Sequence, residues 1–405
     1  MKFQKNRLEH SKLGGELDRR SFLKFAAAGA AAASFAPSVW GEDGPVTLAK
    51  FPEKTGLILL TDRPPQLETP LKYFRTDLTP NDAMFVRWHL SGIPTSVDLE
   101  SFRLSIGGHV ANPLSLSMAD LQKLEQVSVV AVNQCSGNSR SFAEPRVPGG
   151  QWQNGAMGNA RWTGVRLRDL LAKAAVKNGA VDVTFQGLDR PALPTTPAFV
   201  KSLEFEKAND GEVIVAYAMN GQPLPMLNGF PIRLIVPGWF ATYWVKSLNQ
   251  INVLSERFHN FWMDKAYRVP KTPELEESPG DLAKETTPIS TMLVRSLFVR
   301  PEPGEHVAAG ALFDIDGIAF DGGSGIKKVE LSLDGGASWI ETQLGEDLGK
   351  YSFRRWRHPW KPAAGKYTLK VRATSNAGVT QRAEPNWNRS GYARNNVETL
   401  DVTVM

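Results

Sequence analysis

The sequence predicts an α+β domain followed by an all-β sandwich. Residues 87–269 mix β-branched runs with helical spacing, residues 269–288 are rich in proline and glutamate, and the remainder has short alternating strands between turns. About 370 residues remain beyond an N-terminal leader, more than one hydrophobic core usually serves, so we expect two domains.

The leader is typical of an export signal. Arg19 and Arg20 precede a weakly apolar, Gly/Ala-rich stretch from Phe25 to Ala36, and paired arginines at this place indicate the twin-arginine route. The alternative is a basic, Ala-rich helix, although the apolar run is too short to span a bilayer. We therefore expect residues 1–40 to hold the signal and the start of the mature chain, and the protein to reach the periplasm folded.

The charge gives little reason to expect a nucleic-acid partner. The formal net charge is +5, but residues 1–36 hold seven basic and three acidic side chains, so cleavage near Ala36 leaves about +1. No later stretch is long and apolar enough for a membrane span, so a soluble mature protein is expected.

Residues 41–268 are expected to form a loop-rich α+β domain. Strands are predicted where β-branched or buried apolar runs occur: Val127–Val132, Val213–Tyr217 and Ile232–Val236. A helix is predicted over Val165–Ala175, where four apolar side chains share one face: Leu167, Leu170, Leu171 and Ala174.

Residues 269–288 have a composition suited to an extended linker. Beyond it, Leu312–Phe320, Ile326–Ser332 and Tyr367–Ala373 are short strands punctuated by turns such as Asp334-Gly335-Gly336. This regular spacing predicts an immunoglobulin-like sandwich over residues 289–405, without the cysteine pair of antibody domains.

The chain has a single cysteine, Cys135, in a polar loop directly after a predicted strand. One cysteine forms no internal disulfide and no Cys-x-x-Cys-His haem site, so no haem is expected in this chain. Three interpretations remain open: a buried structural cysteine, a nucleophile whose base the sequence does not identify, or a thiolate bound to a transition metal.

Two further clusters carry chemistry. Arg87 and His89 share a face of a predicted strand, although a surface arginine beside a partly buried histidine is common. Arg233, Thr242 and Lys246 lie in a segment whose amides and cations could surround a phosphate, with an aromatic-rich turn as the alternative.

Taken together, the motifs resemble the sulfite oxidase family of molybdenum enzymes, in particular bacterial periplasmic sulfite dehydrogenases without a fused haem domain. The resemblance runs from about Pro64 to the C-terminus. It rests on seven segments: Phe85–His89, Val132–Arg140, Gly158–Trp162, Met226–Arg233, Tyr243–Lys246, Phe261–Arg268 and Trp387–Asn395.

The resemblance implies a molybdenum–molybdopterin cofactor with Cys135 as the protein ligand of the metal. It implies a cationic sulfite pocket of Arg87, Arg140 and Arg394, with Tyr267 directed at the reacting centre and Trp152 in the pocket wall. Residues implied to hold the pterin and its phosphate, together with Arg87 and Cys135, are His89, Asp189, Asn228, Arg233, Thr242 and Lys246. Asn228 stands where animal enzymes carry histidine. The sandwich matches the family's dimerisation domain.

The implied reaction is oxidation of sulfite to sulfate by oxygen-atom transfer, with electrons passed to a c-type cytochrome. The resemblance also implies a homodimer, or a heterodimer with a cytochrome subunit. Three alternatives stay open: sulfane dehydrogenase of a thiosulfate-oxidising complex, methionine-sulfoxide reductase, or a non-catalytic binding protein that retains the fold.

Overall fold

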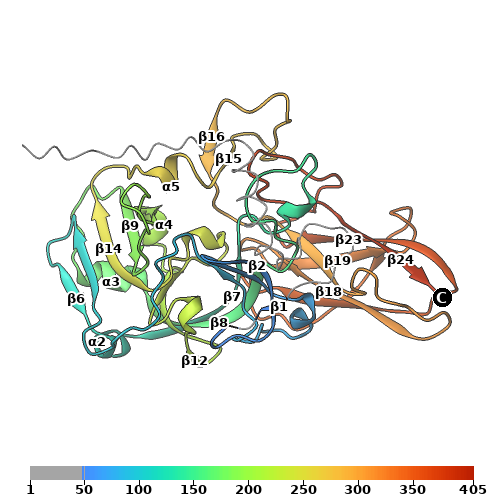
Figure 1. The fold of residues 1–405 in the computed structure, drawn as a ribbon, viewed down its shortest axis with the longest axis horizontal. Helices are drawn as coiled ribbons and strands as arrows, with labels where there is room; N and C mark the ends of the chain where they lie inside the picture. The colour runs from blue at the N-terminus through green and yellow to red at the C-terminus, as the bar shows by residue number, and fades with distance from the viewer. Residues whose placement is uncertain (1–47, 50) are drawn as a thin grey trace, which may run out of the picture. The chain divides into compact units, whose positions relative to one another are not determined.

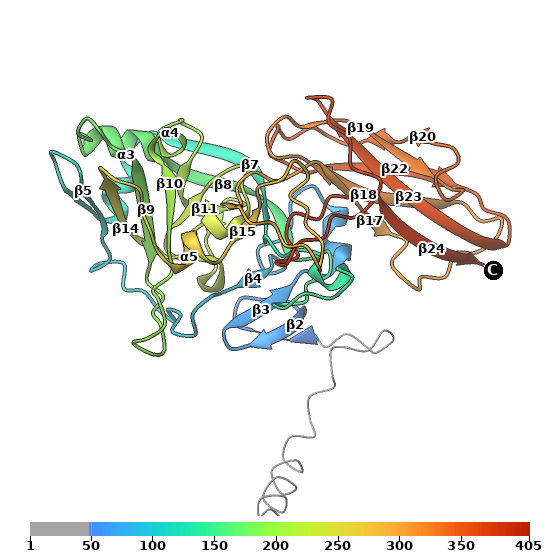
Figure 2. The same cartoon turned by 90° about the horizontal axis from the view of Figure 1, so that it is seen from above.

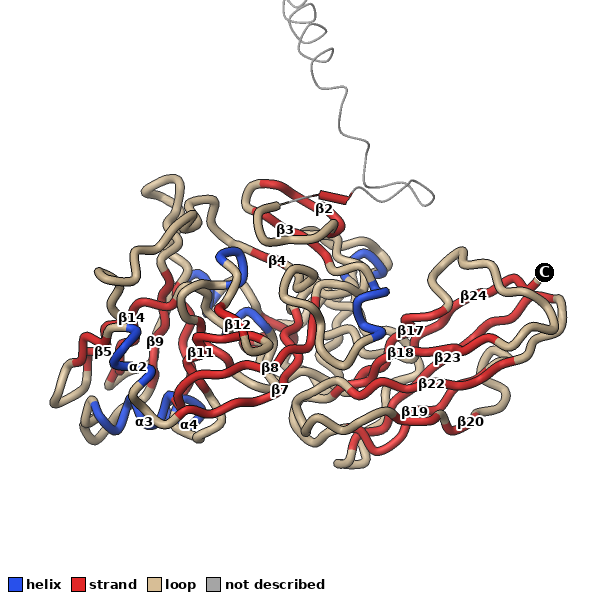
Figure 3. The backbone as a smooth tube through the Cα atoms, turned by 90° about the horizontal axis from the view of Figure 1, so that it is seen from below, coloured by secondary structure: helices blue, strands red, loops and turns tan. Residues whose placement is uncertain are grey.

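The computed structural model describes residues 48–49 and 51–405 (Figure 1). The predicted twin-arginine signal lies outside these residues. Strands dominate, and the helices are few and short among long loops, as Figure 3 shows. None of the helices in the described part of the chain is long and apolar enough to cross a membrane.

An antiparallel sheet of order β12-β11-β8-β7, with β13 paired to β11, carries the cysteine loop. Strand β7 alternates between exposed and half-buried residues at its start and is fully buried over its last five residues, so it delivers Cys135 into the interior. The bounds are β7 Gln126–Gln134, β8 Met157–Arg166, β11 Ile214–Met219, β12 Gln222–Pro223 and β13 Arg233–Ile235.

A second sheet has the order β10-β9-β14-β5-β6, in which only β14 and β5 run parallel. The helix expected over Val165–Ala175 is found as α3 (Leu167–Lys173), shorter at both ends, with Val165 and Arg166 belonging to β8, and the four apolar side chains predicted on one face are all buried. Figure 2 shows α3 and α4 beside this sheet. The bounds are β5 Leu104–Gly108, β6 Leu114–Leu116, β9 Asp182–Gly187, β10 Val200–Glu204 and β14 Leu248–Leu254.

Short helices and turns connect these sheets. The α-helices are α2 Met118–Gln122, α4 Phe205–Ala208 and α5 Phe261–Asp264, and the 3-10 helices are η1 Leu71–Arg75, η2 Arg140–Phe142, η3 Met226–Asn228 and η4 Ala241–Tyr243. Helix α2 begins at Ser117 in a capping box, because its hydroxyl accepts from Asp120 N while the Asp120 carboxylate accepts from Ser117 N.

A four-stranded sheet, β1-β2-β3-β4, precedes the other two. Its last strand covers only two residues, so the expected strand over residues 85–89 is shorter than predicted, and His89 lies beyond it. The bounds are β1 Leu48–Ala49, β2 Leu57–Asp62, β3 Pro65–Glu68 and β4 Val86–Arg87.

The predicted sandwich is confirmed. Two four-stranded antiparallel sheets, β17-β18-β22-β21 and β20-β19-β23-β24, enclose an apolar core that includes Ile315, Val329 and Val371. The bounds are β17 Arg295–Arg300, β18 Phe313–Phe320, β19 Ile326–Ser332, β20 Ile340–Glu341, β21 Gln343–Leu344, β22 Arg354–Trp360, β23 Gly365–Ser375 and β24 Glu398–Val404.

The segment 269–288 does not run as an extended linker. Strands β15 (Arg268–Pro270) and β16 (Thr286–Pro288) pair antiparallel at its two ends. The chain between them is held by Glu277, whose buried carboxylate accepts hydrogen bonds from the backbone N–H and the guanidinium of Arg389. A contact distant in sequence therefore overrides the local composition.

The sandwich shares a core with the domain before it, and residues 48–405 form one compact unit. Leu297, Phe320 and Phe353 belong to the same apolar cluster as Leu170 and Ile251. A buried polar contact adds to this junction, because Arg295 Nη2 donates to Ser139 Oγ at 2.7 Å and to Asn154 Oδ1 at 3.0 Å.

Candidate active site

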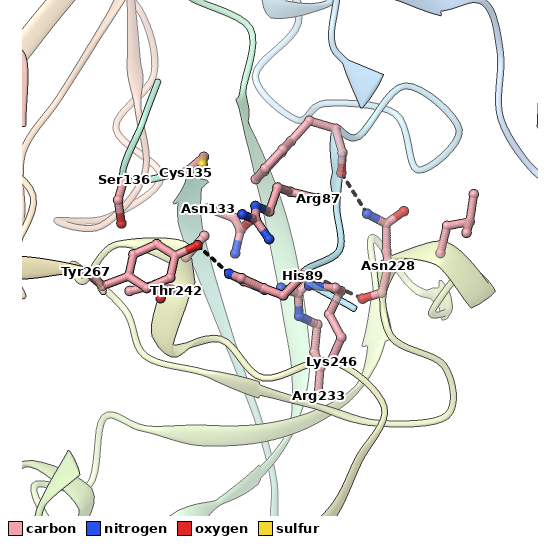
Figure 4. Close-up of a pocket in the computed structure, with 13 residues that line it drawn as sticks. Arg87, His89, Asn133, Cys135, Ser136, Asn228, Arg233, Thr242, Lys246 and Tyr267 are labelled. Atoms are coloured by element: carbon pink, nitrogen blue, oxygen red, sulfur yellow. Dashed lines mark hydrogen bonds between the residues drawn. The ribbon is translucent and has the colours of Figure 1, made fainter. Parts of the chain in front are cut away.

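A cavity lies where the ends of β4 and β7 meet η3, η4 and the segment after α5 (Figure 4). It gathers eight of the twelve residues implied by the resemblance, although the chain supplies them from widely separated segments. The lining residues are Phe85, Arg87, His89, Asn133, Cys135, Ser136, Leu227, Asn228, Arg233, Ala241, Thr242, Lys246 and Tyr267.

Cys135 follows the last residue of β7 and is 8% exposed. Its backbone N–H donates to Ala156 O at 2.9 Å, which continues the pairing of β7 with β8, and its carbonyl accepts from Asn138 N at 3.0 Å. The loop therefore turns immediately after the cysteine, with the thiol at the cavity. A thiolate in this place is a soft metal ligand.

The cavity collects positive charge. Arg233 is buried against the rings of Trp162 and Trp244, with its guanidinium carbon 5.1 and 5.9 Å from their centroids, and burial lowers its pKa to about 9. Lys246 is half-buried and lines the cavity, with its Nζ 4.6 Å from the centroid of the Trp88 ring. Burial lowers its pKa to about 7, while Asp189 and Cys135 act in the opposite direction. Buried cations of this kind require an anion nearby.

Four polar side-chain atoms at the cavity have no hydrogen-bond partner within the described residues: Asn133 Nδ2, Ser136 Oγ, Arg233 Nε and Thr242 Oγ1. Buried polar groups are almost always paired in folded proteins. Unpaired donors beside unpaired cations therefore indicate a site built for a polar, anionic group.

Tyr267 and His89 form a second polar pair in the cavity. The Tyr267 hydroxyl contacts His89 Nε2, and the His89 ring stacks on Phe199 with centroids 3.8 Å apart. Burial lowers the pKa of His89 well below 6.5, aided by Arg87, so the imidazole is neutral near neutral pH, and the tautomer sets whether Nε2 donates to or accepts from the hydroxyl. Burial raises the pKa of Tyr267, which keeps its hydroxyl protonated.

The backbone of Tyr267 is strained. Its φ of 57° lies in the left-handed region that non-glycine residues seldom adopt. The ring of Tyr267 stacks on that of Tyr392, with centroids 5.8 Å apart and planes 1° from parallel. Strain of this kind persists only where the surroundings fix it, and it is common at functional sites.

Four of the residues implied by the resemblance do not line this cavity. Arg140 lies behind Tyr392, with its guanidinium carbon 5.0 Å from the ring centroid, and donates to Ser390 O and Gly150 O. A Cβ at Gly137 or Gly149 would lie 2.7 or 2.6 Å from this guanidinium, so the glycines make room for it.

The other three residues outside the cavity lining are Trp152, Asp189 and Arg394. Trp152 is buried edge-on against Phe85, and Asp189 contributes charge close to Lys246. Arg394 lines a separate cavity with Glu398 and donates to Phe142 O at 3.2 Å.

Sequence reasoning missed other residues of the site. Asn133 and Ser136 flank Cys135, and their place beside the end of a predicted strand was a usable signal. Tyr392 lies in the segment Trp387–Asn395, but no sequence feature distinguished it from its neighbours there. Lys54, which contacts Asn228, lies in a stretch with no motif at all.

Comparison with known proteins assigns families to three segments. Residues 90–262 match the oxidoreductase molybdopterin binding domain, residues 286–403 match the Mo-co oxidoreductase dimerisation domain, and residues 16–36 match the twin-arginine translocation pathway signal sequence.

Related proteins are similar in sequence over most of this chain. Mitochondrial sulfite oxidase of Rattus norvegicus is 36% identical over 304 residues, covering 73% of this chain and 53% of that protein. Sulfite oxidase of Arabidopsis thaliana is 32% identical over 286 residues, covering 67% of this chain and 72% of that protein. This chain thus spans about half the length of the rat enzyme.

A solved structure shares the fold. The sulfane dehydrogenase SoxCD from Paracoccus pantotrophus superposes with a TM-score of 0.74 and 22% sequence identity, over 97% of this chain and 94% of that chain. An identity this low shows a common architecture and leaves the substrate of this chain open.

Proposed function

Because this chain belongs to the sulfite oxidase family of molybdenum enzymes, we propose that it is a periplasmic sulfite dehydrogenase that passes electrons to a c-type cytochrome. Its twin-arginine signal supports export to the periplasm. The observation that carries the proposal is the single thiol of Cys135 at a cavity with buried, unpaired cations.

The residues of the cavity fit a molybdopterin group. Its phosphate is an anion with several acceptors, and Arg233 Nε, Thr242 Oγ1 and the ammonium of Lys246 offer donors and charge. Cys135 would ligate the metal, while His89, Asn228 and Arg87 would contact the pterin. The bound group supplies the two-electron redox chemistry of oxygen-atom transfer.

The remaining side chains bind and orient the substrate. Arg87, whose Nη1 donates to Trp88 O at 3.0 Å, projects into the cavity beside Cys135 and would hold the sulfite oxyanion. The Tyr267 hydroxyl would donate its one hydrogen to the same oxyanion and accept a hydrogen bond from the Nε2–H tautomer of neutral His89. Arg140 would act on the site through Tyr392 rather than by direct contact.

The overall reaction is balanced by water and an external acceptor. In the net reaction sulfite gains one oxygen atom, which water supplies. Two protons are released, and two electrons leave the protein. We propose a c-type cytochrome as the acceptor, either as a transient partner or as a subunit, and dimerisation through residues 286–403.

The test is a substrate comparison on exported, purified protein whose molybdenum and pterin contents have been measured. Sulfite-dependent reduction of cytochrome c supports the proposal. Turnover with a thiosulfate-loaded carrier protein would assign it to the sulfane dehydrogenases instead, and reduction of methionine sulfoxide to a reductase. Protein without molybdenum from a cofactor-competent host would point to a non-catalytic role.

A further inference from the structure

Lys54 is a buried lysine outside the cavity wall. It lies between β1 and β2 and is 9% exposed. Its Nζ donates to three acceptors: Asn81 O at 2.7 Å, Met84 O at 3.0 Å, and the side-chain oxygen of Asn228. Lys54 therefore joins the segment before β2 to a residue that lines the cavity.

The three contacts match the donor capacity of a lysine ammonium, which has three N–H groups and no acceptor. A neutral amine could satisfy only two of them. Burial lowers the pKa of Lys54 to about 7, while Asp82 and Glu53 raise it. The geometry of its acceptors thus supports the charged form at this position.

The contact fixes the orientation of the Asn228 amide. Because Lys54 can only donate, Oδ1 of Asn228 must face it, and Nδ2 must face the other way. Nδ2 donates to Phe85 O at 3.0 Å, which uses one of its two hydrogens. Figure 4 shows Nδ2 directed at that carbonyl, and because Asn228 lines the cavity, its second N–H is left for a bound group.

The backbone of Asn228 is fixed as well. Its carbonyl accepts from Arg233 Nη1 at 3.0 Å, and its N–H donates to Pro225 O at 2.9 Å. Gly229 follows with a φ of 109°, where a Cβ would lie 3.0 Å from Lys246. The Asn228 side chain is therefore held by its backbone and by its amide group. Lys54 determines which atom of the amide, oxygen or nitrogen, faces the cavity.

We propose that Lys54 is a positioning residue of the cofactor site, which orients the Asn228 amide so that an N–H donor faces the bound molybdopterin group. Without Lys54, Oδ1 of Asn228 is left buried and unpaired, and rotation of the amide would present an acceptor to an anionic ligand. The inference rests on the cofactor of the proposed function and not on the identity of its substrate.

The experiment compares four variants of the full, exported chain: Lys54→Met, Asn228→Ala, the double variant, and Asn228→Asp. The measurements are molybdenum and released pterin per folded chain, and the rate at which both are lost on mild heating. Groups that orient a metal-site ligand typically change affinity by about 10- to 100-fold. We expect both single variants to lose the cofactor faster by a factor in this range, and the double variant to lose it no faster than Asn228→Ala.

Asn228→Asp separates orientation from folding. Its carboxylate keeps a charged partner for Lys54 but offers no N–H to the cavity, so we expect a folded protein that loses the cofactor about as fast as Asn228→Ala. This variant can overturn the inference even if Lys54→Met does not fold, because it lacks the proposed N–H donor. Lys207→Met removes a lysine that pairs with Asp210 away from the cavity, and it should retain the cofactor as wild type does.

Three results would overturn the inference: wild-type retention in folded Lys54→Met, wild-type retention in Asn228→Asp, or effects of Lys54→Met and Asn228→Ala that multiply in the double variant. A purely structural role of Lys54 would lower the Tm of cofactor-free protein and leave retention per folded chain unchanged. A wild-type protein without molybdenum would contradict the proposed function itself, so the two failures are distinguishable.

Discussion

Individual residues of the cavity depart from the rules that govern the rest of the protein. Arg233 is a buried cation and Lys246 a half-buried one, neither has a hydrogen-bonded carboxylate, and Tyr267 has a left-handed backbone. Each feature lowers the stability of the protein by itself. Their coincidence in one cavity is explained if a bound anionic group compensates them, because functional sites are where such departures concentrate.

Cys135→Ser should abolish sulfite oxidation in a protein that still folds. The side chain is small, and its backbone contacts to Ala156 and Asn138 do not involve the thiol. A hydroxyl is a harder and poorer ligand for a metal that binds thiolates. The measurement is steady-state turnover together with Tm, and near wild-type turnover would show that Cys135 is not the metal ligand.

Tyr267→Phe should lower kcat/KM for sulfite by about 10- to 100-fold while molybdenum is retained. The hydroxyl contact to His89 is lost, whereas the ring can keep its stacking on Tyr392. Turnover, KM and metal content are measured on one preparation. Unchanged efficiency at full metal loading would refute the role of the hydroxyl, and loss of metal would make Tyr267 a structural residue.

At the scale of elements, a loop of the C-terminal region supports the site, because its Tyr392 stacks on Tyr267 of the cavity wall. Asn388 Nδ2 donates to Tyr392 O at 2.9 Å, and Asn388 Oδ1 accepts from Tyr392 N at 3.0 Å, so one side chain fixes the backbone of Tyr392. Ser390 O accepts from Arg140 in the same loop. The loop is held in turn by the contacts of Arg389 with Glu277.

Arg389→Ala should lower the free energy of unfolding by about 1.5–3 kcal/mol at neutral pH, because it removes charge-assisted hydrogen bonds to a buried carboxylate. The hydrogen bonds of Arg389 hold the pKa of Glu277 below 4.5, so the stabilisation is complete above that value and is lost as the pH falls through the lowered pKa. Chemical denaturation at several pH values measures the difference between wild type and variant, which should shrink below pH 4.5.

Lys271→Ala is the matched control on the same segment. Lys271 and Glu285 form an exposed pair, with side chains 66% and 76% accessible, and such pairs contribute about 0–1 kcal/mol. An effect of Arg389→Ala no larger than that of Lys271→Ala would show that the loop does not depend on the Glu277 contact.

Elements defined by local pattern were predictable from the sequence. Strand β19 begins and ends at the predicted residues, since its alternation of apolar and polar side chains reflects its own two faces. The course of residues 269–288 was not predictable, because it depends on Glu277 meeting Arg389 more than one hundred residues later. Local composition contains no information about that contact.

In the candidate site, too, features set by local pattern were predictable, and features set by contacts distant in sequence were not. The motif around Cys135 indicated a ligand loop, and the structure places that loop at the cavity. The direction of a long side chain is set by its neighbours in space, so sequence could not show that Arg394 lies beside Glu398 in a separate cavity. Lys54 was missed for the same reason, because its partners are distant in sequence.

For the whole molecule, the pH dependence of stability should differ between cofactor-free and cofactor-bound protein. Burial lowers the pKa values of Lys201 and Lys246 to about 7, against 10.5 for an exposed lysine. Between these values the unfolded chain binds more protons than the folded chain, so the stability of cofactor-free protein should rise with pH across this window.

A bound anion beside Lys246 opposes the effect of burial and raises its pKa, so the folded, cofactor-bound protein keeps that proton to higher pH. Its stability should then rise less steeply above pH 7 than that of protein made in a host without cofactor synthesis. Tm measured at intervals from pH 7 to about pH 9.5 on both forms gives the two slopes. Groups remote from the cavity titrate alike in both forms and cancel in the comparison, so equal slopes would mean that the bound group carries no negative charge close to Lys246.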